Sequence, residues 1–109
     1  MTFLAIDAQK NLFTLQKSQL QFEQTLVMSR ANFITKEMGY YESDMSDDTN
    51  WDAETDAYYQ DLVSQEQYLE TRQDSLDSQI SALDNEISSM KNMVNSNIKT
   101  SCSLNLIGG

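Results

Sequence analysis

Proline and histidine are absent from this sequence, and it contains one cysteine and three glycines in 109 residues. Proline is the residue that most strongly interrupts a helix, so its absence permits long uninterrupted helices. A single cysteine, Cys102, excludes an intrachain disulfide, and the lack of histidine excludes an ordinary structural zinc site. We expect Cys102 to be a small residue near a helix end, with a disulfide between two chains as the alternative.

Basic residues are also scarce, since seven Lys and Arg stand against 17 Asp and Glu, for a net charge of −10. Such a charge repels a phosphate backbone, so we expect no nucleic-acid partner. It disfavours anionic membrane surfaces as well, and no apolar run approaches the roughly 20 residues of a membrane-spanning helix. The first residues lack a basic leader and are interrupted by Asp7, which predicts no cleaved signal peptide. The compartment stays open between the cytoplasm and export without such a signal.

Catalytic patterns are missing too. There is no histidine, no recognisable nucleophile motif and no glycine-rich phosphate loop to accompany the carboxylates. An acid–base pair needs positioned groups of matched pKa, whereas these carboxylates fit solvated helix faces. The sequence therefore predicts a protein that is not an enzyme and that needs no cofactor.

Residues 57–101 carry a heptad repeat. The row at position d and the row at position a, four residues later, predict a coiled-coil helix. Polar Glu66 and Gln73 occupy the earlier a positions, where polar residues set register. The d row consists of Leu62, Leu69, Leu76, Leu83 and Met90, and the apolar part of the a row consists of Ile80, Ile87 and Val94.

Residues 1–38 form a second amphipathic segment with a much broader apolar face. At about 100° per residue its seven-residue rows cover roughly half of a helix circumference, so we expect this helix to contact at least two others. Large exposed apolar faces mark association surfaces. The rows are formed by Ile6, Phe13, Leu20, Val27 and Ile34, by Leu12, Leu26 and Phe33, and by Leu15 and Phe22.

Residues 39–56 are acidic and predict a loop followed by the start of the second helix. Gly39 is suited to capping the first helix, and Thr49 or Asn50 to starting the second, with the acids up to Asp56 in its early turns. One continuous helix is the alternative. The aromatic residues beside the loop are expected to pack and close the hairpin tip, or to form a surface for a partner. They are Tyr40, Tyr41, Trp51, Tyr58 and Tyr59.

The loop also contains side chains with oxygen ligands at alternate positions, Asp48, Asn50 and Asp52, as a calcium-binding EF-hand loop does. That motif requires glycine at its sixth position and a bidentate glutamate at its twelfth. This chain has Ala53 and Tyr59 there. We therefore expect no metal in the loop.

Together these features predict one all-α domain, a long helical hairpin with a heptad-repeat coiled coil that assembles into a multi-helix oligomer. The apolar rows named above form the expected assembly interface, and residues 102–109 form a short tail. We expect a self-assembling structural subunit, with a filament or a tube as one form of its assembly. The alternative is a small adaptor or chaperone that binds a partner helix as a closed oligomer. In layout alone, the chain resembles the helical-hairpin needle and filament subunits of bacterial export systems.

Overall fold

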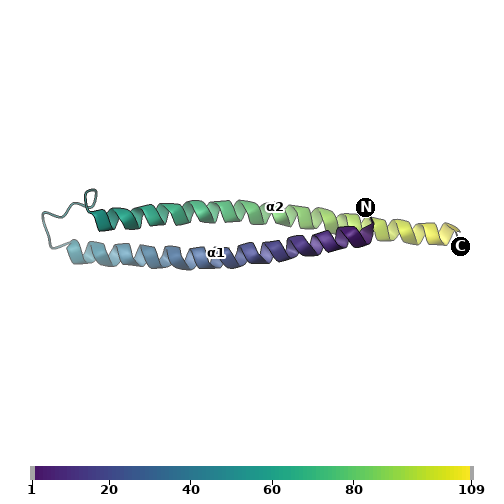
Figure 1. The fold of residues 1–109 in the computed structure, drawn as a ribbon, viewed down its shortest axis with the longest axis horizontal. Helices are drawn as coiled ribbons and strands as arrows, with labels where there is room; N and C mark the ends of the chain where they lie inside the picture. The colour runs from purple at the N-terminus through teal and green to yellow at the C-terminus, as the bar shows by residue number, and fades with distance from the viewer. Residues whose placement is uncertain (1, 109) are drawn as a thin grey trace. The chain divides into compact units, whose positions relative to one another are not determined.

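Two long helices make up this protein. The computed structural model describes the backbone of residues 2–108 and the side chains of residue 2 and residues 4–100. Helix α1 spans Phe3–Met45 and α2 spans Ala57–Gly108, joined by a loop, and the described residues include no strand (Figure 1). The predicted all-α helical hairpin is confirmed, and the alternative of one continuous helix is wrong.

Short polar side chains begin both helices. The Ala5 N–H donates to Thr2 Oγ1 (3.3 Å) and the Ile6 N–H to the Thr2 carbonyl (3.1 Å) at the start of α1. At the start of α2, the Tyr59 N–H donates to Asp56 Oδ1 (2.8 Å). These bonds satisfy donors that the first turn of any helix leaves without an intrahelical partner.

The expected helix end at Gly39 is wrong. Helix α1 continues to Met45, and Gly39 does not have a positive φ. A glycine inside a helix costs only about 1 kcal/mol relative to alanine. Contacts on both sides of Gly39 oppose that cost, because Met38 packs on the apolar core and Tyr41 on the aromatic residues of the loop.

The expected start of α2 at Thr49 or Asn50 is also wrong, since the helix begins at Ala57 and its first turn contains no acid. Asp52 and Glu54 lie before it. The Asp52 side chain accepts the Glu54 N–H (3.0 Å), and the Asp52 carbonyl accepts the Asp56 N–H (3.0 Å). These local bonds hold a turn that competes with helix. At its other end, α2 runs to Gly108 through residues expected to form a tail.

The hairpin divides into two compact units, one of Phe22–Asp77 and one of the residues up to Gln21 and from Ser78 onward. In the Phe22–Asp77 unit, Ile34 of α1 and Leu62 and Leu69 of α2 form a buried cluster. Val27, Ala31 and Met38 pack against this cluster. In the other unit, Ile6 of α1 and Val94 of α2 are the buried apolar side chains among those described.

Side-chain pairs between the helices show that they run antiparallel. Lys17 forms an ion pair with Asp84 in one unit. In the other, Arg72 Nε donates to Glu23 Oε1 (2.9 Å) and Thr35 Oγ1 donates to Glu66 Oε2 (3.4 Å). Within this unit, moving forward along α1 therefore means moving back along α2.

Each helix presents two seven-residue rows to the other, and every residue of these four contact rows is buried or half-buried. Within a unit, a contact-row residue of α1 lies opposite the α2 residue for which the two residue numbers sum to about 100, and we call two such residues level. Each polar residue in a row is level with an apolar residue of the other helix. Thus Lys17 is level with Leu83, and Glu66 with Ile34. The rows are Ile6, Phe13, Leu20, Val27 and Ile34; Lys10, Lys17, Gln24, Ala31 and Met38; Leu62, Leu69, Leu76, Leu83 and Met90; Glu66, Gln73, Ile80, Ile87 and Val94.

Replacing Gly39 with alanine should stabilise the hairpin. An added Cβ would meet no atom within 4 Å. Because alanine loses less backbone entropy in a helix, we expect Gly39→Ala to raise the free energy of unfolding by roughly 0.5–1 kcal/mol. Chemical denaturation followed by circular dichroism measures this change, and a decrease would show that the position requires glycine.

Leu76→Ala should destabilise the protein far more than Leu4→Ala. Leu76 is 0 % exposed and Leu4 is 68 % exposed, so the two variants remove the same atoms from opposite environments. We expect a loss of about 2–5 kcal/mol for Leu76→Ala and roughly 0.5 kcal/mol or less for Leu4→Ala. Equal losses in denaturant titrations would contradict the assignment of Leu76 to the helix–helix contact.

Candidate interaction surfaces

The fold separates the predicted assembly residues into two groups. The larger group lies in the contact rows and is shielded within the chain, with Ile6, Ile34, Leu62, Leu69, Leu76 and Val94 buried and Phe13, Leu20, Val27, Ile80, Leu83, Ile87 and Met90 half-buried. The second group is at least half exposed and consists of Leu12, Leu15, Phe22, Leu26 and Phe33. The second group is the part of the predicted interface that a further molecule can reach.

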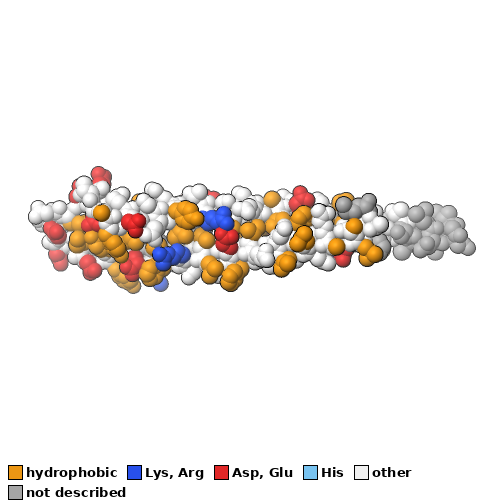
Figure 2. Space-filling model, in the orientation of Figure 1, with side chains coloured by type: hydrophobic (Ala, Val, Ile, Leu, Met, Phe, Trp, Pro, Cys, Tyr) orange, Lys and Arg blue, Asp and Glu red, His pale blue; other side chains and the backbone are white. Residues whose placement is uncertain are grey.

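Leu12 and Leu15 in one unit, and Phe22, Leu26, Phe33 and exposed Tyr40 in the other, share one face of α1 by their sequence spacing, and we call these six residues the outer stripe. Successive members are 3, 7, 4, 7 and 7 residues apart. At about 100° per residue, the stripe is centred roughly 160° from the middle of the two α1 contact rows. It therefore faces away from α2. Figure 2 shows hydrophobic side chains gathered over α1 on the face in view.

A cation borders the outer stripe. The Arg30 guanidinium carbon lies 5.4 Å from the centre of the Phe33 ring, and the same side chain donates to Gln65 Oε1 of α2 (3.4 Å). Contact between a guanidinium and a ring face is attractive and leaves the opposite ring face available. Arg30 thus contacts one face of the Phe33 ring while Phe33 remains exposed.

Helix α2 has no comparable row among its described side chains. Its exposed large apolar residues, Tyr58, Tyr68, Met93 and Ile98, are 10, 25 and 5 residues apart. Scattered apolar residues are normal on a protein surface, whereas several that recur on one face of a helix mark a candidate contact surface. Among the described side chains, the outer stripe is therefore specific to α1.

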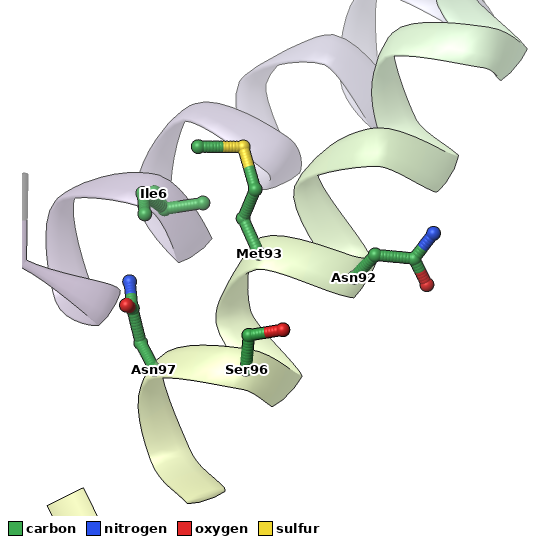
Figure 3. Close-up of a pocket in the computed structure, with 5 residues that line it drawn as sticks. All are labelled: Ile6, Asn92, Met93, Ser96 and Asn97. Atoms are coloured by element: carbon green, nitrogen blue, oxygen red, sulfur yellow. The ribbon is translucent and has the colours of Figure 1, made fainter. Parts of the chain in front are cut away.

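A small pocket of ≈ 340 Å³ lies between the helices near residue 6, lined by Ile6, Asn92, Met93, Ser96 and Asn97. Figure 3 shows Met93 and Asn97 of α2 directed toward α1 near Ile6, while Asn92 points away. The lining offers amides, a hydroxyl and apolar groups but no group that titrates. This chemistry suits solvent or a contacting side chain rather than catalysis.

The hairpin tip is organised around the Asp56 carboxylate. Its Oδ2 accepts the Tyr41 hydroxyl (2.6 Å) and the Trp51 Nε1–H (3.0 Å), while Oδ1 caps α2. The rings pack on one another, with 4.8 Å between the Tyr41 and Tyr58 centroids and 5.7 Å between those of Trp51 and Tyr59. These contacts support the expectation that aromatic residues close the tip for Tyr41, Trp51, Tyr58 and Tyr59, whereas Tyr40 is exposed. Asp56 joins Tyr41 and Trp51 by hydrogen bonds.

These hydrogen bonds shift two pKa values in opposite directions. The bond to Asp56 raises the pKa of Tyr41 to about 12, and the Tyr41 hydroxyl lowers the pKa of Asp56 below 3.8. Ionised Asp56 therefore stabilises the folded tip fully above pH 3.8, and this contribution is lost as pH falls through the lower folded pKa. The neutral Tyr41 phenol contributes fully below pH 10.0 and loses its contribution as pH rises through about 12.

The loop acids considered for calcium are used in turns instead. Asp48 Oδ1 accepts the Asn50 N–H (2.9 Å), and Asp52 Oδ1 accepts that of Glu54. Across the part of the chain with described side chains, no three ligating side chains converge on a point where a metal ion would fit. The loop thus has the local geometry of successive Asx turns.

Charge is unevenly distributed along the chain. Residues 2–38 have four basic and three acidic side chains, residues 39–56 have seven acidic and none basic, and residues 57–100 have three basic and seven acidic. The net charges of these segments are thus +1, −7 and −4. The acid-rich tip is the part of the chain that most strongly repels a second copy of itself.

Three further expectations have different outcomes. Neither helix, over its described residues, has the combination of length and apolar character needed to cross a membrane. The side chains of Cys102 and of the expected tail lie outside the described residues.

Comparisons with protein-family models, curated proteins and solved structures gave no match.

Asp56→Asn should lower the pKa of Tyr41 from about 12 toward 10.0, because asparagine can still cap α2 but carries no charge. Phenolate absorbance during alkaline titration measures the change, as one tyrosine ionising earlier than in the parent protein. Asp48→Asn is the matched control, since it removes the same charge from the loop at a carboxylate that accepts the Asn50 N–H rather than a tyrosine hydroxyl. An unchanged titration curve for Asp56→Asn would contradict the described tip.

Proposed function

We propose that this chain is a non-enzymatic structural subunit that self-assembles through the outer stripe of α1. The observation that carries this proposal is the position of the stripe, whose six apolar side chains lie on the face of α1 turned away from α2. An apolar row of this length facing water is unfavourable at roughly 25 cal/mol for each Å² exposed. Association with another apolar helix face removes that cost.

The same proposal takes the hairpin itself to be an antiparallel coiled coil. Its support is the agreement between the seven-residue rows and the shielded side chains, together with cross-helix pairs that follow one antiparallel register. A helix with one such row on each of two opposite faces can join two helical layers. Helix α1 would then pair with α2 on one face and with another molecule on the other.

A structural role also fits the way this protein uses its polar groups. The groups with shifted pKa values, Tyr41, Asp56 and Tyr59, hold the tip together by hydrogen bonds. In an enzyme, such groups would converge on a cavity where a substrate could react. Here they connect the loop to the ends of the two helices.

Filaments and closed oligomers are two forms of such an assembly. A filament requires two different complementary surfaces on each chain, whereas a closed pair requires one surface that matches itself. The second candidate function is an adaptor or chaperone that holds a partner's amphipathic helix on the outer stripe. One such stripe among the described side chains favours a closed pair or this candidate over extended growth, and the net charge of −10 would favour a basic partner.

Phe22→Asp should weaken self-association, while Tyr68→Asp should not. Phe22 is 67 % exposed on the outer stripe, and Tyr68 is 69 % exposed on α2, so both substitutions leave the helix–helix contact intact. A charge placed in an apolar interface should weaken association at least about tenfold. Light scattering across a concentration series measures the mass, with negative-stain microscopy to distinguish filaments from small oligomers. A parent protein that stays monomeric throughout would refute the proposed function.

A further inference from the structure

We infer that the hairpin opens in two steps, in which the unit near the chain ends separates as one piece while the unit near the tip stays folded. We call Phe22–Asp77 the tip unit, and the residues up to Gln21 and from Ser78 onward the terminal unit. The inference goes beyond the proposed function, because it concerns a single chain and holds whether or not chains associate. Partial opening of this kind occurs where buried apolar contacts are few.

Buried apolar side chains are concentrated in the tip unit. In the terminal unit, Ile6 and Val94 are buried and level with each other, and the other contact-row residues are half-buried. Stabilisation follows the apolar area that is removed from water, so each turn of the terminal unit costs less to separate. The buried residues of the tip unit are Ile34, Leu62, Leu69 and Leu76.

The helix–helix contact of the terminal unit is also incompletely filled. The pocket of ≈ 340 Å³ beside Ile6 lies within this unit, between α1 and residues 92–97 of α2 (Figure 3). Atoms that face an unfilled space lose the dispersion contacts that a partner atom would supply. Polar residues interrupt the contact rows of both units, so burial and packing are what distinguish the two.

Hydrogen bonds between distant parts of the chain reinforce the tip unit. Asp56 accepts bonds from Tyr41 and Trp51 while it caps α2, and Thr35 donates to Glu66 (3.4 Å). These bonds and the apolar cluster must all be lost before the tip unit can open. In the terminal unit, the ion pair of Lys17 with Asp84 joins side chains that are 29 % and 49 % exposed, and such pairs contribute little to stability.

Chain connectivity sets the order of the two steps. The loop joins the two helices within the tip unit, where Thr35 and Glu66 are 31 residues apart, whereas Lys17 and Asp84 of the terminal unit are farther apart in the sequence. If the tip unit opened first, its chain would remain a loop held closed by the terminal unit, and it would gain less entropy than two free ends gain. The terminal unit therefore opens first, and the tip unit opens when the whole chain unfolds.

The first step uncovers apolar rows that the closed hairpin shields. Phe13 and Leu20 of α1 and Ile80 and Ile87 of α2 are half-buried in the closed form, and separation of the helices in this unit exposes them. These residues are distinct from the outer stripe. A molecule that binds them shifts the chain toward the opened form, because it has no such site on the closed one.

Hydrogen exchange at increasing denaturant concentrations tests the two steps on the whole chain. We expect the amides of residues 10–20 and 80–94 to share one opening, with protection at least about tenfold below that of residues 27–34 and 62–73, which exchange by global unfolding. Equal protection in the two units would overturn the inference. Protection that decreases gradually toward the chain ends, without a shared opening, would show simple fraying and overturn it as well.

Matched substitutions test the order of opening. Ile6→Val and Ile34→Val remove the same methyl group from residues of α1 that are 2 % and 1 % exposed. Ile6→Val should lower protection about two- to tenfold in both units, because global unfolding includes the opening of the terminal unit. Ile34→Val should lower protection by a similar factor in the tip unit alone.

Each contrary result has a definite meaning. Lower protection of the terminal unit in Ile34→Val would show that the two units open together, and an effect of Ile6→Val confined to neighbouring amides would show that the terminal unit does not open as one piece. Either result overturns the inference. A parent protein that stays monomeric at every concentration refutes the proposed function and leaves these exchange measurements unaffected, so the two failures are distinguishable.

Discussion

Contact between the apolar rows of α1 and α2 is the interaction on which the rest of this structure depends. Isolated helices gain little stability in water from their own hydrogen bonds, so packing must supply it. The buried cluster of Ile34, Leu62 and Leu69 and the buried pair Ile6 and Val94 provide this packing in the two units. The register that produces these contacts also turns the outer stripe away from α2, which is why the proposed assembly depends on the same contact.

Polar residues within the contact rows make the register more specific. Lys17 is level with Leu83 and can extend to Asp84, with which it forms an ion pair. Its alkyl stem covers apolar surface while its charge reaches the edge of the contact. A shift along the helices would separate such pairs and leave polar groups against apolar ones without partners. Surface ion pairs contribute little energy individually, so their main effect here is on alignment.

The tip reverses the chain direction without proline or a positive φ among the described residues. Asp56 holds the chain reversal instead of a proline or a glycine with positive φ. Its carboxylate caps α2 and accepts hydrogen bonds from Tyr41 near the end of α1 and from Trp51 in the loop. The acidic tip that results repels its own copy. In the proposed assembly, the residues that close the hairpin therefore also influence how two hairpins can meet.

The sequence by itself determined that the chain is helical, that it folds back once, and which rows are apolar, because composition and seven-residue spacing are local properties of the chain. It did not determine the helix ends at Met45 and Ala57, since contacts of Tyr41 and Asp56 across the loop oppose the local preferences of Gly39 and Thr49. The sequence pattern also predicted that the apolar rows of the first helix form one broad face. Only the tertiary structure decided which of them is covered, because burial depends on where α2 lies, and that left the outer stripe exposed.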